Sequence, residues 1–337
     1  MKRLKIGING FGRIGRAFTR IASQKDQFDI VAINTRKTPN DMLAYLLQHD
    51  SVYRKFDKKV IATQDGISIE DKLIKTFQSN DPSSIPWESV NVDIVVDATG
   101  AFTTKEDLSK HIRGSVKKVI LTAPAKDDTI PHVVMGVNDN QINFQNETVF
   151  SNASCTTNCA SPMFKVLHDN FNILTGFLTT AHAYTQTQSL LDDAGKDIER
   201  SRAAGLNIVP STTGAAKAIV KTIPALEGKI DGMALRVPVP TVSFSDISVI
   251  VSKQTSIEEV NNAFKKASEE HLKDILHYET EILVSSDYIG SPYSCTFDSN
   301  YTKVLNGHLI KAFGWYDNEW GYSNRLVDLV GTLNKVL

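Results

Sequence analysis

Cysteine is scarce in this sequence, with only Cys155, Cys159 and Cys295 among 337 residues. A sparse, odd-numbered set argues against a disulfide framework and favours a reducing compartment. No apolar run reaches about 18 residues, the length that a membrane-spanning helix needs. A strand pattern also begins almost at Met1, where a signal peptide would lie. We therefore expect a cytoplasmic protein without a membrane span.

An excess of charge of either sign is also missing. The 37 basic and 38 acidic residues give a formal net charge of -1, so no global field attracts nucleic acid. No block of like charges predicts a disordered tail. The expected partners are therefore small molecules and copies of the same chain, and 41% hydrophobic residues suffice for two medium-sized domains.

The first half of the chain has the pattern of an open parallel sheet. An apolar run, a glycine turn, an amphipathic stretch and a second apolar run follow one another over residues 4–34, which predicts a βαβ unit. Buried-strand patterns recur at 92–100 and 117–124. The prediction is an α/β fold, with a Rossmann-type doubly wound parallel sheet that ends near Ser154.

The second half mixes longer strands with helices. Alternating strands are expected over 234–252, and helices over 212–223 and 256–272, a mixture typical of an α+β domain. A last helix is expected near the C-terminus because apolar residues recur there at the spacing of one helix face, at Leu326, Val327, Val330 and Leu333.

The glycine turn reads Gly10-Phe11-Gly12-Arg13-Ile14-Gly15 and lies between a strand and a helix. In that context it predicts a dinucleotide site: Gly10 allows the tight turn, Gly12 lets the backbone approach a pyrophosphate, and Gly15 lets helix and strand pack. The helix N-terminus adds free N–H groups for the phosphates. The alternative is a plain turn that uses its glycines only for positive φ.

Thr35 occupies the position, twenty residues after Gly15, where an NAD site usually carries Asp or Glu. Threonine removes a carboxylate that would repel a 2′-phosphate, while Arg36 and Lys37 supply positive charge. The pattern favours NADP, with NAD as a second possible cofactor. A solvated loop tip is the alternative.

Cys155 follows a short apolar strand and precedes an amphipathic helix. A thiol at a helix N-terminus has a lowered pKa and neighbouring N–H groups that can bind an oxyanion, so Cys155 is the candidate nucleophile. An inert buried cysteine is the alternative. Pro162 predicts a kink or a restart of this helix, and Cys295 is expected in the core, on a strand.

His182 stands at the end of an apolar strand and is the candidate imidazole for activating the thiol. Cys159 lies one helical turn after Cys155, which could suggest a metal pair or a redox disulfide. However, this geometry does not suit a disulfide and no zinc spacing accompanies it. No metal site is expected.

Six stretches together resemble one known family, phosphorylating glyceraldehyde-3-phosphate dehydrogenase, over nearly the whole chain: INGFGRIGR, SNASCTTNC, HAYT, STTGAAKA, DGMALRVP and WYDNEWGYSNR. The resemblance implies reversible oxidation of glyceraldehyde 3-phosphate to 1,3-bisphosphoglycerate with NADP or NAD, in glycolysis or gluconeogenesis, by a homotetramer. It also implies a dinucleotide-binding domain over 1–154 and 319–337 and a catalytic domain over 155–318.

The resemblance implies roles for single residues as well. Cys155 would form a thiohemiacetal and then a thioester, His182 would act as its base, and Asn318 would orient the nicotinamide. Contacts to the cofactor are implied for Arg13 and Ile14 at the diphosphate and for Thr99 and Thr122 at the ribose and nicotinamide side. Phosphate contacts are implied for Thr185 and Arg236 with the substrate, and for Ser154, Thr156, Arg200, Thr213 and Gly214 with the incoming phosphate.

The sequence departs from the NAD-type members of the family at several positions. Those members carry Asp at the position of Thr35, commonly Arg near Asn80, and an acid at Thr187, so each departure loosens a contact. The stretch LDDAGKD, where they often read LDLPHKD, resembles the NADP-using branch, although its Asp193 is an acid.

Two alternatives stay open. Erythrose-4-phosphate dehydrogenase shares the chemistry, although HAYT and STTGAAKA fit it poorly. A catalytically inactive Rossmann protein that senses nucleotides or contacts RNA would keep the fold. The presence of both Cys155 and His182 speaks against that second alternative, and no basic patch interleaved with aromatic residues predicts a specific nucleic acid partner.

Overall fold

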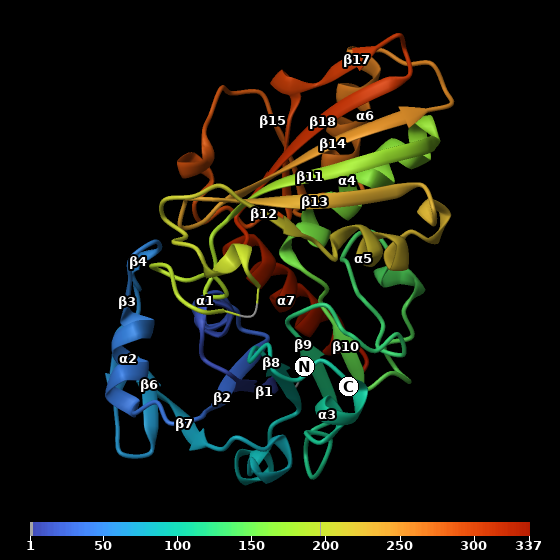
Figure 1. Cartoon of the computed structure of the whole chain (residues 1–337). Coiled ribbons are helices and arrows are strands. Elements are labelled where there is room, and N and C mark those ends of the chain that lie inside the picture. The colour runs from blue at the N-terminus through green and yellow to red at the C-terminus, as the bar shows by residue number, and fades with distance from the viewer. Residues whose placement is uncertain (1–2, 196) are drawn as a thin grey trace. The chain divides into compact units, whose positions relative to one another are not determined.

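The computed structural model describes residues 3–195 and 197–337. The chain divides into two compact units (Figure 1). The first runs up to Val133 and adds Gln141–Ala153 and Ser323–Leu337, and the second comprises Val134–Asn140 and Ser154–Tyr322. None of the helices in the described part of the chain is long and apolar enough to cross a membrane.

The predicted βαβ unit opens the first unit, as β1 (Leu4–Asn9), α1 (Arg13–Ala22) and β2 (Phe28–Thr35). The strand order of its sheet is β10-β9-β8-β1-β2-β7-β6-β5. The other strands are β5 (Val60–Ala62), β6 (Gly66–Ile69), β7 (Lys72–Gln78), β8 (Ile94–Asp97), β9 (Lys118–Leu121) and β10 (Val149–Ser151). Strand β1 pairs in parallel with β2 on one side and β8 on the other. The doubly wound sheet is therefore confirmed, and its topological switch point lies between β1 and β8.

Smaller elements complete the first unit. They are α2 (Asn40–Gln48), the hairpin of β3 (His49–Asp50) and β4 (Arg54–Lys55), and α3 (Lys105–Ser109). The last helix, α7 (Trp320–Leu333), belongs to this unit from Ser323 onward. All four apolar residues predicted to line its buried face are buried, at Leu326, Val327, Val330 and Leu333.

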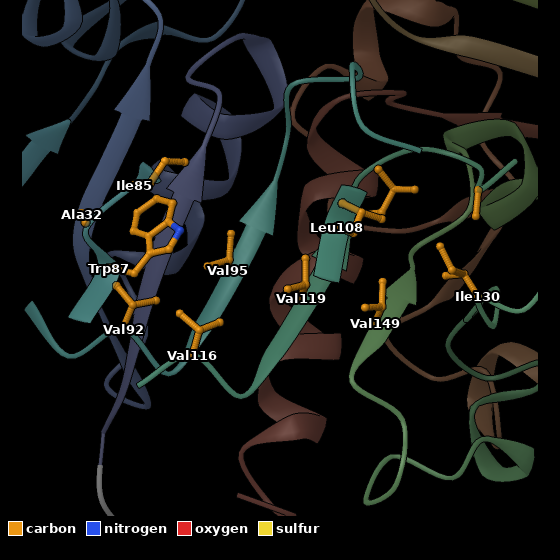
Figure 2. Packing of buried hydrophobic residues seen from close by; sticks show 12 residues of the cluster. Ala32, Ile85, Trp87, Val92, Val95, Leu108, Val116, Val119, Ile130 and Val149 are labelled. Atoms are coloured by element: carbon orange, nitrogen blue, oxygen red, sulfur yellow. The ribbon is translucent and has the colours of Figure 1, made fainter. Parts of the chain in front are cut away.

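A hydrophobic cluster supports the first sheet from one side. Figure 2 shows the Trp87 indole among Ile85, Ala32 and Val92, all of them buried. The cluster continues past Val95 on β8. Aromatic and β-branched residues in these positions remove large apolar areas from water, and this burial stabilises the sheet. The sheet in turn supports the loops that follow its strands.

The second unit is built on a sheet of order β12-β13-β11-β14-β18-β16-β15, with β17 paired to β18. Its strands are β11 (Ile173–Ala183), β12 (Val209–Thr212), β13 (Ile230–Val237), β14 (Ser243–Val251), β15 (Leu276–Glu279), β16 (Cys295–Asp298), β17 (Lys303–Leu305) and β18 (Leu309–Tyr316). Figure 1 shows β13, β11, β14 and β18 side by side. Cys295 is buried at the start of β16, as predicted.

Three helices accompany this sheet. They are α4 (Cys155–Phe171), α5 (Ala215–Thr222) and α6 (Ile257–Glu269). A capping box of Ser256 and Glu259 satisfies backbone N–H groups at the start of α6, which explains why the helix begins at this position.

Pro162 predicts a kink or a restart of the first of these helices, and the restart is wrong, whereas the kink stays a prediction. Helix α4 continues through Pro162 to Phe171, and the residues on either side of the proline are buried. Proline inside a helix costs about 3 kcal/mol through the lost hydrogen bond and the ring clash. Burial of Met163, Phe164 and Leu167 stabilises by a comparable amount per side chain, so packing outweighs the local preference.

Candidate active site

The start of α4 presents Cys155 as its first residue. Ser154 is the N-cap, and its Oγ accepts a hydrogen bond from the backbone N–H of Thr157 at 3.1 Å. This cap satisfies one free N–H group of the first turn. The backbone N–H groups of Cys155 and Thr156 approach the sulfur of Cys155 and favour its ionised form. The predicted position of Cys155 at a helix N-terminus is confirmed.

His182 reaches the same place from the end of β11. Its Nε2 lies 3.3 Å from Sγ of Cys155, within reach of a hydrogen bond to sulfur. The side chain is buried, and its ring meets the Tyr316 ring edge to face at 6.0 Å. The fold thus brings together the two residues that the sequence proposed as nucleophile and base.

The electrostatics of this pair differ from the prediction. Burial raises the pKa of the Cys155 thiol to about 11, although the charge of Arg236 and the N–H of Thr156 act to lower it. The expectation of a lowered thiol pKa is therefore wrong, because desolvation outweighs the helix terminus. Burial, followed by the charge of Arg236, lowers the pKa of His182 to about 3. At neutral pH the pair is a thiol beside a neutral imidazole.

Arg236, on β13, contacts the other side of the imidazole. Its Nη1 lies 2.6 Å from Nδ1 of His182 and 3.2 Å from the carbonyl oxygen of Ala183. The Nδ1 atom also lies 2.7 Å from that same carbonyl oxygen. Sequence reasoning assigned Arg236 to a phosphate, and its contact with His182 carried no signal in the sequence.

Tyr316, at the end of β18, is a functional candidate that sequence reasoning missed. Its hydroxyl lies 2.9 Å from Oγ1 of Thr156 and 2.8 Å from Oγ1 of Thr180. Thr180 uses its only hydroxyl hydrogen on the carbonyl oxygen of Phe244, so Tyr316 donates to Thr180 and Thr156 donates to Tyr316. Burial raises the pKa of Tyr316, which keeps that proton in place. Tyr316 lies on the face of β18 where every second residue is buried, but large apolar residues occur on both faces of LIKAFGWY, so the sequence held no signal for it.

The remaining predicted phosphate contacts lie in three segments of the second unit. Arg200 donates from Nη2 to Oγ of Ser211 at 2.7 Å and also pairs with exposed Asp197 at 3.5 Å. Oγ1 of Thr213 accepts from the N–H of Ala215 at the start of α5, where Gly214 is the N-cap.

Thr185 follows β11, and its Oγ1 lies 2.9 Å from Oγ1 of Thr187. Threonine at position 187 therefore offers Thr185 a hydroxyl partner and no charge. Lys196, inside the stretch LDDAGKD, lies outside the described residues, and Asp193 in that stretch accepts a hydrogen bond from the N–H of Ala194.

Apart from Asn318, the residues predicted to bind the cofactor lie in the first unit, and their geometry fits a dinucleotide. Gly10 has a φ of +93°, and a Cβ there would meet the backbone of Ala98 and Thr99 at 2.8 Å. The turns after β1 and β8 thus touch at the switch point, where ligands of such sheets bind. A Cβ on Gly12 would meet nothing within 4 Å. Gly12 is also the N-cap of α1 and brings no side-chain cap, so no N-cap side chain covers the helix start, where phosphates bind in such folds.

The other cofactor candidates lie in the turns at the same edge of the sheet or at the start of α1. Thr99 donates to Asp97 at 2.6 Å, and Thr122 directly follows β9. Ile14 is half-buried in the first turn of α1. The guanidinium of Arg13 is paired with Asp50.

Thr35 is the last residue of β2 and is buried, yet its Oγ1 has no hydrogen-bond partner in the described structure. Arg36 and Lys37, which follow it, are exposed. A buried hydroxyl without a partner is costly, so this atom is suited to a ligand oxygen. Asn80, on the turn after β7, is exposed as well.

A buried polar chain beneath these turns was also missed by sequence reasoning. Asn34 donates to Asn9 at 2.8 Å, Asn9 donates to Asp97 at 2.8 Å, and Asp97 lies 3.3 Å from Nε2 of His111. Because Trp87 donates to Nδ1 of His111 at 3.1 Å, Nε2 carries the hydrogen and donates to Asp97. The chain ties β2, β1 and β8 together below the predicted cofactor site.

In the second unit, Asn318 is buried and its Oδ1 accepts a hydrogen bond from Ser243 at 3.1 Å. This bond orients the amide and leaves Nδ2 as its donor. Within the described residues no group of three or more His, Cys, Asp or Glu side chains is placed to hold a metal ion.

Comparison with known proteins agrees with this geometry. Two family models match, described as the NAD binding domain of glyceraldehyde 3-phosphate dehydrogenase over residues 4–105 and its C-terminal domain over residues 154–318. The chain is 50% identical over 327 residues to glyceraldehyde-3-phosphate dehydrogenase 2 of Streptomyces avermitilis, covering 97% of each chain. It is 45% identical over 328 residues to glyceraldehyde-3-phosphate dehydrogenase 2 of Bacillus subtilis, covering 97% of this chain and 96% of the relative. With both domain models matched and such identity over nearly the full length, the chain belongs to the glyceraldehyde-3-phosphate dehydrogenase family.

Proposed function

We propose that this chain catalyses the reversible oxidation of glyceraldehyde 3-phosphate to 1,3-bisphosphoglycerate, with inorganic phosphate and a nicotinamide cofactor, through a thioester on Cys155. The observation that carries the proposal is the approach of Cys155 Sγ to His182 Nε2 at 3.3 Å. This contact lies at a helix N-terminus, with Arg236 beside it. A thiol, a base, donors for an oxyanion and a cation for a phosphate are the groups that acyl transfer to phosphate needs.

The first step forms the carbon–sulfur bond. His182 takes the thiol proton at Nε2, and the sulfur electron pair bonds to the aldehyde carbon. The carbonyl oxygen becomes an oxyanion near the N–H groups that start α4, and the proton returns to it, which gives a thiohemiacetal. The lowered pKa of His182 keeps it unprotonated at neutral pH but also makes it a weaker base. The charge of Arg236 and the N–H of Thr156 therefore have to stabilise the thiolate as it forms.

The second half of the reaction makes the acyl phosphate. A bound nicotinamide cofactor supplies the acceptor for the hydride of the thiohemiacetal carbon. His182 then takes the hydroxyl proton as that carbon becomes the carbonyl of a thioester. A phosphate oxygen next attacks the thioester carbon, the carbon–sulfur bond breaks, and Cys155 leaves as thiolate and recovers a proton. One aldehyde, one phosphate and one oxidised cofactor thus give one acyl phosphate, one reduced cofactor and one proton.

Two groups of residues are assigned to the phosphates within this proposal. Thr185 and Arg236 hold the phosphate of the substrate. The incoming phosphate is held by Ser154, Thr156, Arg200, Thr213 and Gly214. Support comes from Arg236, which has no carboxylate partner among the described residues, and from the start of α5, where the N-cap Gly214 brings no side-chain hydrogen bond.

NADP is the cofactor that the proposal favours, with NAD accepted more weakly. The buried Thr35 hydroxyl has no partner, and two exposed cations follow it. The cofactor is assigned to the dinucleotide-binding domain over 1–154 and 319–337, and to Asn318 of the catalytic domain over 155–318. Within the first of these, the assigned residues are Gly10, Gly12, Arg13, Ile14, Gly15, Thr35, Arg36, Lys37, Thr99 and Thr122.

A homotetramer in the cytoplasm completes the proposal. Large apolar side chains gather in residues 190–208 with most of their surface exposed: Leu190 86%, Leu191 73%, Ile198 87%, Leu206 82% and Ile208 66%. Such a gathering on one segment marks a surface that another protein covers, and identical copies are the commonest partners of soluble enzymes.

The test is an assay of the purified chain with glyceraldehyde 3-phosphate, inorganic phosphate and either NAD or NADP. We expect reduction of the cofactor that requires phosphate and is lost in Cys155→Ser. The buried Cys159→Ser serves as the matched control and should keep activity. Faster turnover with erythrose 4-phosphate would reassign the substrate, and no phosphate-dependent reduction of either cofactor would refute the proposal.

A further inference from the structure

The Nδ1 atom of His182 lies next to a hydrogen-bond donor and a hydrogen-bond acceptor. The donor requires Nδ1 to be without a hydrogen, and the acceptor requires Nδ1 to carry one. Nη1 of Arg236 lies 2.6 Å away and the carbonyl oxygen of Ala183 lies 2.7 Å away. A guanidinium only donates hydrogen bonds and a carbonyl only accepts them. The same nitrogen cannot accept from Arg236 and donate to Ala183 at once, so only one of these hydrogen bonds is made at a time.

The choice at Nδ1 decides what Nε2 offers to Cys155. A neutral imidazole carries one hydrogen, on one nitrogen or the other. If Nδ1 accepts from Arg236, the hydrogen sits on Nε2 and points at Sγ. If Nδ1 donates to Ala183, the lone pair of Nε2 faces Sγ at 3.3 Å. Only this second tautomer can take the thiol proton.

Arg236 is held loosely enough to leave the imidazole. Within the described residues its guanidinium has no carboxylate partner, and its buried Nε has no hydrogen-bond partner at all. The other nearby cation, Arg200, is instead bonded to Ser211 and Asp197 and has no bond to the ring. A phosphate would offer Arg236 two charge-assisted hydrogen bonds in place of one bond to a neutral nitrogen.

We propose that Arg236 is an anion-released clamp on His182: pairing of its guanidinium with phosphate frees Nδ1 to donate to Ala183 and so turns Nε2 into the base for Cys155. The ring proton moves from Nε2 to Nδ1 by exchange with water, and no other bond changes. The inference rests on the proposed function, and it makes arrival of a phosphate group the event that activates the thiol.

Four charged or titratable groups act on the ring among the residues that the structure describes. They are Cys155 from α4, Arg236 from β13, Tyr316 from β18 and Arg200 from the 3-10 turn Glu199–Ser201. If Arg236 acted only through its charge, the effect of removing it on the reaction rate of Cys155 would be opposite to the effect that the clamp predicts. Because the charge of Arg236 favours the Cys155 thiolate, removing or neutralising it should slow any reaction of the thiolate. The two explanations therefore differ in sign.

The test is the rate at which iodoacetamide alkylates Cys155 in the full-length protein without cofactor, at neutral pH and constant ionic strength. Mass spectrometry confirms that Cys155 is the residue modified. We expect inorganic phosphate, exchanged for chloride, to speed alkylation of the wild type by roughly ten- to a hundredfold, the range of one hydrogen bond to a charged group. Arg236→Gln in chloride should be alkylated as fast as the wild type in phosphate, and adding phosphate should leave the rate of this variant unchanged.

Arg202→Gln is the matched control, because it removes the same charge from an exposed side chain that pairs with Asp192 and is assigned to no phosphate. It should react in chloride at close to the wild-type rate. Slower alkylation of Arg236→Gln, slower alkylation of the wild type in phosphate, or equal acceleration by both variants would overturn the clamp. These rates need no turnover, so a protein that oxidises glyceraldehyde 3-phosphate but fails this test refutes the clamp alone.

Discussion

Sγ of Cys155 lies 3.3 Å from Nε2 of His182, although the two residues are 27 positions apart in the sequence. Burial raises the pKa of the thiol and lowers the pKa of the imidazole, so the two groups rest as a neutral pair. The reaction then depends on proton transfer between them at the moment of attack, and less on a thiolate that exists beforehand.

Replacing His182 by asparagine should therefore lower kcat/KM with glyceraldehyde 3-phosphate by roughly a hundred- to ten-thousandfold, the contribution typical of a general base. The matched control is His271→Asn, since His271 is exposed. Steady-state kinetics with saturating phosphate measure the effect. A His182→Asn variant within about tenfold of the wild type would show that another group takes the proton.

Stability should fall in mild acid because of His182. The unfolded chain binds a proton on this residue near its ordinary pKa of 6.5, whereas the folded chain does not until the pH reaches about 3. Unfolded molecules therefore hold more protons between these values, and the free energy of unfolding drops as the pH falls through that window, by at most about 1.4 kcal/mol per pH unit.

Urea unfolding over this pH range, with wild type and His182→Gln side by side, measures the contribution. The glutamine variant cannot take up the proton, so its unfolding free energy should depend less steeply on pH. Parallel curves for the two proteins would mean that His182 titrates alike in both states.

Thr35→Asp should shift cofactor preference toward NAD. The new carboxylate accepts a hydrogen bond from a 2′-hydroxyl and repels a 2′-phosphate, an effect of roughly ten- to a hundredfold in the ratio of kcat/KM values. Thr38→Asp is the control, because it adds the same charge three residues along the loop. An unchanged ratio in Thr35→Asp would refute the role proposed for this position.

Gly314→Ala should destabilise the second unit. A Cβ on Gly314 would lie 2.6 Å from Sδ of Met163 and 2.7 Å from Sγ of Cys295, so the core must shift to admit it. Overpacking of this kind costs typically about 1–3 kcal/mol. Gly205→Ala is the control, since a Cβ there would meet nothing within 4 Å. Equal midpoints of urea unfolding for the two variants would contradict the packing argument.

Predictions based on neighbouring residues did well in this protein. The βαβ unit, the helix start at Cys155 and the buried face of α7 follow from apolar spacing, glycines and capping residues, which act over a few positions. Pro162 shows the limit of such reasoning. A local preference against helix is outweighed by the burial of its neighbours, which no window of the sequence can measure.

From the sequence alone we could predict the parallel sheet, the glycine turn at its switch point, and the identity of the candidate nucleophile and base. The family motifs also pointed to Arg236 and to Thr35. These inferences use only residue types and short spacings. Residue types and short spacings do not depend on which distant segments of the chain contact one another.

The protonation states and hydrogen-bond partners of those groups follow from the packing of the folded chain. The bond between Arg236 and His182 joins residues 54 positions apart, and the one between Tyr316 and Thr156 spans 160. The reversed expectation for the Cys155 thiol has the same origin, because burial by the rest of the second unit outweighs the local helix terminus. Desolvation and contacts across strands depend on the packed chain, and their signs cannot be read from neighbours in sequence.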